Sequence, residues 1–143
     1  MKIIILAGNQ GTGKSPTMEI LYNFLTHDMK NKPIQNPIND SKKDFHCVFE
    51  YKEKKVAIYS AGDTLILLFM AIFIYRDVDC LILPFSISKK GIVDLIDEIK
   101  NNKHDKMAPV YKIIPKTECD KNASEKDKDD ANIHDCSIII KAI

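Results

Sequence analysis

A short glycine-rich stretch carries the residues whose types and spacing are best suited to chemistry. It reads Gly8-Asn9-Gln10-Gly11-Thr12-Gly13-Lys14-Ser15 and matches the pattern G-x-x-x-x-G-K-[ST] at every fixed position. The glycines allow a compact loop whose backbone N–H groups turn inward to bind an anion, and a helix starting there adds the positive end of its dipole. Lys14 can then contact phosphate oxygens, and the hydroxyl of Ser15 can ligate Mg²⁺. We therefore predict a phosphate-binding loop.

The segments on either side of this loop have the patterns needed to position it. Lys2 to Ala7 is a continuous apolar run, typical of a strand buried on both faces of a sheet. From Ser15 to about Lys30, Met18, Leu21 and Leu25 recur at spacings of three and four and predict a helix with one apolar face. The loop thus lies between a strand and a helix, which is the setting that the motif requires.

The motif and its setting resemble the Walker A loop of the P-loop NTPase superfamily, and most closely its small nucleotide-kinase-like members. The specific match covers Gly8 to Ser15, and the alternation of strands and helices extends the likeness over the chain at the level of fold. The resemblance implies that these eight residues and Pro16 bind ATP, that Lys14 is catalytic, and that Ser15 holds Mg²⁺. Pro16 departs from the small or hydroxyl residue usual there. A proline is tolerated in the first turn of a helix, but it removes an N–H that could approach the phosphates.

An acidic residue is expected at the C-terminal end of a strand neighbouring the first one, because Mg²⁺ would lie between Ser15 and the tip of that strand. Asp63 is the best candidate, since it follows the apolar run Val56 to Tyr59 and a small, flexible turn. We predict that Asp63 is both a metal ligand and a catalytic residue. The alternative is that Asp63 only caps the next helix. Asp79 is less suitable because it precedes its strand.

The remaining apolar patterns predict an α/β fold, a three-layer sandwich with a mostly parallel central sheet and one antiparallel hairpin arm. The length fits one domain over residues 1–143. After the first strand and helix, the expected order is a loop (31–43), a hairpin (45–51 and 56–59), a helix (64–75), a strand (79–84), a helix (91–102), a strand (110–114), a polar loop (116–130) and a closing helix (131–143).

Two further groups of residues bear on the ligand. The run Asn102-Lys103-His104-Asp105 matches the N-K-x-D tetrad with which GTPases recognise guanine, but there it follows a buried strand and here it follows a predicted helix. We therefore expect adenine nucleotides to bind better than guanine nucleotides. Polar residues after a buried strand can contact base, ribose or acceptor, or can cap the next helix; they are Ser86, Ser88, Lys89 and Lys90.

Composition excludes several classes of partner. With 21 basic and 20 acidic residues the net charge is +1, which argues against nucleic acid as the main partner. The longest apolar stretch, Leu65 to Tyr75, is about half of the roughly twenty residues that span a membrane, so we expect no membrane anchor. The apolar run at Met1 to Ala7 is too short for a signal peptide, and the four cysteines are spaced singly, without metal-ligand spacing. We expect a cytoplasmic protein with reduced thiols.

The sequence leaves two functions open. The first is Mg²⁺-dependent hydrolysis of ATP, or transfer of its γ-phosphate to a small-molecule acceptor. The second is a non-catalytic nucleotide-binding switch that acts through a protein partner. Resemblance to nucleoside monophosphate kinases implies several arginines around the acceptor, whereas this chain has Arg76 alone. Whether the protein is an enzyme therefore stays open at the level of sequence.

Overall fold

The strands expected from apolar runs form one sheet. The computed structural model describes residues 1–27, 44–61, 64–86 and 109–143, and the strand order in that part is β2-β3-β4-β1-β5. β1, β3, β4 and β5 are parallel, and β2 runs antiparallel to β3. The predictions of an α/β fold, a mostly parallel sheet and one antiparallel arm are thus confirmed. The strands are β1 (Lys2–Gly8), β2 (His46–Tyr51), β3 (Lys54–Tyr59), β4 (Cys80–Ser86) and β5 (Val110–Pro115).

β1 lies inside the sheet, between β4 and β5. Its residues Ile3 to Leu6 are completely buried, as a continuous apolar run predicts. The register pairs Gly8, the last residue of β1, with Ser86, the last residue of β4. The carboxyl ends of these strands therefore meet at one edge of the sheet, which is where open α/β sheets bind ligands.

The hairpin arm consists of β2 and β3, joined by a tight turn at Lys52 and Glu53. Both turn residues have positive φ, 49° and 62°, which suits the right-handed twist of the two strands. Cys47 and Phe49 of β2 are completely buried on one face, as the alternation in the sequence predicts.

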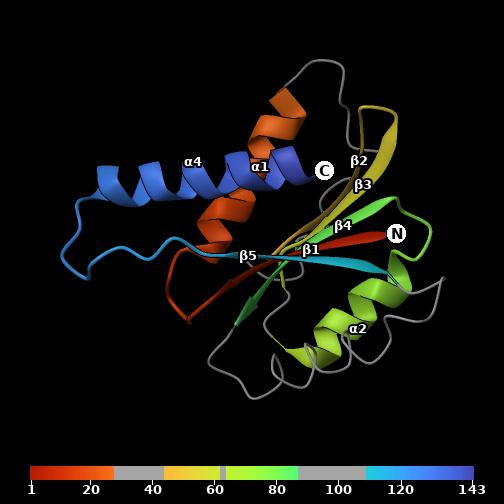
Figure 1. The fold of residues 1–143 in the computed structure, drawn as a ribbon, viewed down its shortest axis with the longest axis horizontal. Coiled ribbons are helices and arrows are strands. Elements are labelled where there is room, and N and C mark those ends of the chain that lie inside the picture. The colour runs from red at the N-terminus through yellow and green to blue at the C-terminus, as the bar shows by residue number, and fades with distance from the viewer. Residues whose placement is uncertain (28–43, 62–63, 87–108) are drawn as a thin grey trace.

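Helices cover both faces of the sheet (Figure 1). α1 (Lys14–His27) and α4 (Glu125–Ala142) pack on one face, and α2 (Leu65–Ile74) packs on the other. This is the arrangement that a three-layer sandwich requires. Among the helices of the described residues, none combines the length and the apolarity that crossing a lipid bilayer requires. The first core contains Ile4, Leu6, Met18, Leu21, Leu25, Cys136 and Ile139, and the second contains Ile3, Ile5, Leu68, Ala71, Tyr75, Leu81 and Phe85.

The start of α4 corrects one prediction. The polar loop was expected to continue to residue 130, but the helix begins at Glu125. The Ser124 side chain accepts a hydrogen bond from the Asp127 N–H, and the Asp127 carboxylate accepts one from the Ser124 N–H, so the two residues form a capping box. Acidic residues in the first turn also complement the helix dipole. The charged residues 125–130 have no apolar stripe, and they are helical because the capping box stabilises the start of the helix.

Candidate phosphate-binding site

The glycine-rich loop occupies the predicted place, between the end of β1 at Gly8 and the start of α1 at Lys14. Gly11 has φ +78° and Gly13 has φ +88°, a backbone region that only glycine adopts without strain. A Cβ on Gly11 would meet no atom within 4 Å, so its backbone conformation, and not crowding, requires glycine there.

The first turn of α1 supplies backbone donors to this loop. The Thr17 N–H donates to the Gly13 carbonyl at 3.2 Å, which is the first hydrogen bond of the α-helical kind at this end. The N–H groups of Lys14 and Ser15 precede it and so have no acceptor within the helix. Ser15 is exposed. The positive end of the helix is therefore open to an anion.

Lys14 is folded back on the loop. Its side chain is almost completely buried, and its ammonium group donates to the carbonyl oxygens of Gly8 at 3.0 Å and Asn9 at 2.7 Å. A phosphate oxygen is a stronger acceptor for an ammonium group than a neutral carbonyl. The ammonium group of Lys14 is thus held against the loop.

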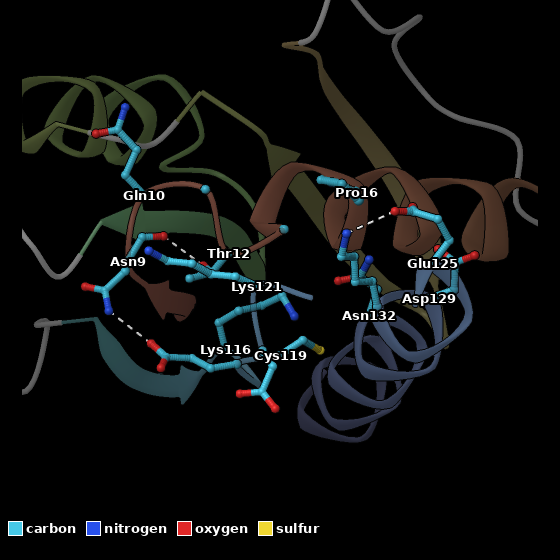
Figure 2. Close-up of a pocket in the computed structure, with 15 residues that line it drawn as sticks. Asn9, Gln10, Thr12, Pro16, Lys116, Cys119, Lys121, Glu125, Asp129 and Asn132 are labelled. Atoms are coloured by element: carbon cyan, nitrogen blue, oxygen red, sulfur yellow. Dashed lines mark hydrogen bonds and ion pairs between the residues drawn. The ribbon is translucent and has the colours of Figure 1, made fainter. Parts of the chain in front are cut away.

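A pocket of about 560 Å³ lies against the loop. Figure 2 shows its two walls: the loop and α1 on one side, and the segment after β5 with the first turns of α4 on the other. Asn9 joins the two walls, because its Nδ2 donates to Glu118 Oε1 at 3.0 Å. The lining residues on the second wall include Lys116, Glu118, Cys119, Asp120, Lys121, Glu125, Lys128, Asp129 and Asn132.

A buried ion pair anchors the second wall. Lys116 Nζ lies 2.8 Å from Asp135 Oδ2, and both side chains are almost completely buried. Asp135 also accepts hydrogen bonds from Thr117, at 3.1 Å from its N–H and 2.5 Å from its hydroxyl. A Cβ on Gly8 would lie 2.6 Å from Lys116 Cβ, so the lysine stem packs directly on the loop. The ion pair therefore fixes the segment after β5 against both α4 and the loop.

The pocket is electrostatically uneven. The loop end offers backbone N–H groups and the positive end of a helix dipole. The opposite wall carries the carboxylates of Glu118, Asp120, Glu125 and Asp129 and also the lysines Lys116, Lys121 and Lys128, of which Lys116 pairs with Asp135 and Lys128 with Glu125 at 3.0 Å. The carboxylates of this mixed wall can accept hydrogen bonds from donors of a ligand whose anionic group lies at the loop.

Cys119 is the accessible thiol of this pocket. It is exposed and lines the pocket, whereas Cys47, Cys80 and Cys136 are buried. Burial raises the pKa of the Cys47 thiol to about 12 and that of the Cys80 and Cys136 thiols to about 11. At pH 8 these three remain protonated, and the thiolate is the reactive form. Cys119 therefore serves as a chemical probe of the pocket.

The predicted acid, Asp63, lies outside the described residues, as do Ser88, Lys89, Lys90 and the run 102–105. The strand that precedes Asp63 in the chain is β3, and β3 is not next to β1 because β4 lies between them. The prediction that Asp63 only caps the next helix is wrong: the N-cap of α2 is Thr64, whose side chain accepts from the Leu67 N–H at 3.3 Å. Ser86, at the tip of β4, is buried beside Gly8.

The hydroxyl of Ser15 is a donor near the loop that is compatible with Mg²⁺ beside a bound phosphate. Within the described residues no three His, Cys, Asp or Glu side chains lie close enough to hold a metal ion together. Mg²⁺ in nucleotide sites typically keeps several waters and binds substrate phosphates with one or two protein groups. The exposed hydroxyl of Ser15 can be one such group, beside the phosphates that the loop would hold.

The residues of the second wall, such as Lys116 and Asn132, were not identified from the sequence, and neither was Asp135, which pairs with Lys116 behind that wall. Lys116 follows the tip of β5, and the rule that ligands bind at the carboxyl ends of strands would have indicated it. No local sequence pattern indicates the roles of Asn132 and Asp135. These roles depend on the packing of α4, and Asn132, for example, contacts Thr17, which lies more than a hundred residues earlier in the chain.

Comparison of the chain with protein-family models, with curated proteins and with solved structures found no match.

Proposed function

We propose that this chain binds ATP, with the triphosphate in the loop Gly8 to Ser15, and that it is a Mg²⁺-dependent ATPase or a small kinase of the P-loop NTPase type. As a kinase it would transfer the γ-phosphate to a small-molecule acceptor. The observation that carries the proposal is the loop itself: a complete G-x-x-x-x-G-K-[ST] motif between a buried parallel strand and a helix, with positive φ at Gly11 and Gly13. An adjacent pocket of about 560 Å³, whose far wall includes carboxylates, supports a ligand longer than phosphate alone.

In this proposal each group has a defined task. The loop N–H groups and Lys14 bind the phosphates, and Ser15 with Asp63 holds Mg²⁺, which when bound neutralises charge on the phosphate oxygens. Asp63 orients the attacking group. The base extends along the pocket toward the segment after β5, where carboxylates such as Asp120 can accept a hydrogen bond from the adenine amino group. We propose adenine over guanine because Asn102 to Asp105 follows a predicted helix instead of a buried strand.

Labelling of Cys119 tests where the nucleotide lies. A thiol reagent at pH 8 is expected to modify Cys119 and leave the three buried cysteines intact. ATP at ten times its Kd should slow this labelling about tenfold, because the base covers the second wall in the occupied fraction. GTP at the same concentration should protect less. The measurement is the labelling rate, followed by intact mass.

Two controls make this result specific. Inorganic triphosphate fills the loop but has no base, so it should leave Cys119 reactive. The Cys119→Ser variant should take up no label. An unchanged rate at saturating ATP would contradict the proposed position of the base, and stronger protection by GTP would contradict the adenine preference.

The Asp63→Asn variant tests the proposed acid. Asparagine is similar in size to aspartate but lacks the negative charge that Mg²⁺ requires. Because Thr64 caps α2, we expect an unchanged melting temperature without nucleotide. Mg²⁺-dependent ATP binding should weaken, and turnover should be lost. Calorimetry with and without Mg²⁺ and a phosphate-release assay measure these effects.

Asp77→Asn is the matched control for this variant, since it makes the same change at an exposed residue just after α2. It should behave like the native protein. If Asp63→Asn retains native Mg²⁺ dependence and turnover, Asp63 is not the metal-binding acid, and the residues after β4 become the place to search.

An alternative function is a nucleotide-binding switch that acts through a protein partner, and one observation favours it. α2 exposes large apolar side chains at helical spacing, which are common where proteins associate: Ile66, Phe69, Met70, Phe73 and Ile74. Turnover by the purified protein alone would exclude a purely non-catalytic switch. ATP binding without turnover would favour it.

A further inference from the structure

Asn132 of α4 is a buried polar residue with only part of its hydrogen-bonding capacity used. Its side chain is 5% exposed, and its Oδ1 accepts from the Thr17 hydroxyl at 3.1 Å. Thr17 shares that proton with the Gly13 carbonyl at 3.0 Å. Among the described residues, the Nδ2 of Asn132 has no hydrogen-bond partner.

The amide nitrogen of Asn132 is accessible to solvent, and Asn132 is one of the residues that line the pocket. In the part of the chain that the structure describes, no completely buried side-chain nitrogen or oxygen lacks a partner, so Nδ2 must be accessible to solvent. Asn132 lines the pocket, at the end where α1 and α4 meet (Figure 2). Its Oδ1 lies 3.1 Å from the position that a Cβ on Gly13 would take, so the amide adjoins the loop.

Pro16 also lines the pocket, and it has no backbone N–H that could donate a hydrogen bond there. In the first turn of α1, the N–H group of Thr17 is bonded to the Gly13 carbonyl. The helix start therefore offers one donor fewer to an anion than other sequences would.

We propose that Asn132 is a phosphate-binding residue, whose Nδ2 donates to an oxygen of the bound anion in place of the N–H that Pro16 lacks. This inference rests on the proposed function, because it requires an anion in the loop. It deepens that function by assigning part of the site to α4. A primary amide has two N–H donors and no charge, so it adds a directional contact to a site whose charge comes from Lys14 and the helix.

Calorimetry with inorganic triphosphate tests the contact without a base. Asn132→Ala should bind roughly 10- to 100-fold more weakly than the native protein, as expected for loss of a hydrogen bond to a charged group. Asn23→Ala is the matched control, because it makes the same change at an exposed residue of α1 that does not line the pocket. It should bind like the native protein.

A double-mutant cycle with Pro16→Ala separates binding from packing. Alanine restores the backbone N–H, so Pro16→Ala should bind triphosphate more tightly than the native protein. In that background the loss caused by Asn132→Ala should fall to about threefold or less, because the two donors serve the same oxygen. A residue that only holds α4 against α1 would show the same loss in both backgrounds.

NMR of the native protein tests the same inference without any substitution. Binding of triphosphate should shift the side-chain N–H resonances of Asn132 together with the backbone resonances of Lys14 and Ser15. If the loop resonances shift and those of Asn132 do not, or if Asn132→Ala binds normally, the inference is wrong and the proposed function stands. If the native protein does not bind triphosphate or ATP, the proposed function fails, and this inference fails with it.

Discussion

The Lys14→Ala variant is expected to bind ATP about 10- to 150-fold more weakly than the native protein. Its ammonium group is positioned at the loop, where it donates to the carbonyls of Gly8 and Asn9. Removing it deletes a charge-assisted contact to phosphate, worth roughly 1.5 to 3 kcal/mol. Calorimetry with Mg²⁺-ATP measures the effect, and thermal unfolding of the free variant shows whether the fold is retained.

Lys141→Ala is the matched control, because it removes the same charge from an exposed residue in the last turn of α4, at the opposite end of that helix from the pocket. Its affinity for ATP should be native, apart from a small effect on the overall field. Equal affinities for Lys14→Ala and Lys141→Ala would count heavily against a phosphate site at the loop.

The Asp135→Ala variant is expected to lower the free energy of unfolding by about 3 to 5 kcal/mol. The change leaves the buried ammonium group of Lys116 without its counter-charge, and leaves Thr117 without the acceptor of its N–H and hydroxyl. That is a large fraction of the roughly 5 to 15 kcal/mol that stabilises a typical domain. Urea denaturation followed by circular dichroism measures it.

A double variant distinguishes loss of the pair from loss of a carboxylate. Replacing both partners, with Lys116→Met and Asp135→Leu, removes both charges together and should restore most of the stability. Asp130→Ala, an exposed position of α4, should change stability by no more than about 0.5 kcal/mol. A loss below about 1 kcal/mol for Asp135→Ala would show that the pair does not hold the pocket wall.

Local patterns predicted the elements that depend on local physics. The apolar run at Lys2 to Ala7, the alternation at Phe45 to Tyr51 and the helical stripe after Ser15 each became the expected strand or helix, within a few residues. The loop between Gly8 and Ser15 was predicted with its neighbours for the same reason, since its glycines and the adjoining helix start are consecutive in the chain. The strand, the loop and α1 form one local unit.

The order of strands and the second wall could not be predicted in this way. Nothing in the sequence states that β4 lies between β1 and β3, because the side-by-side order of parallel strands depends on crossovers and long-range packing. Nor does a local pattern bring Lys116 against Gly8. The early start of α4 was nearer to being predictable, since Ser124 and Asp127 have capping-box spacing, although the residue usual at the third position is glutamate or glutamine and not aspartate.

The position of β1 in the sheet also sets an order of assembly during synthesis. β1 pairs Lys2 with Cys80 on one side and with Val110 on the other, so neither edge of this strand is satisfied by its sequence neighbours. The glycine loop and α1 leave the ribosome before the residues that pack on the loop, such as Lys116 and Asn132. Such non-local pairing slows folding, because loop-closure entropy is lost before the contacts form. A nascent chain therefore forms the pocket beside the loop only after the segment that follows β5 and α4 have been made, and until then β1 is an unpaired apolar strand that a chaperone or another chain can bind.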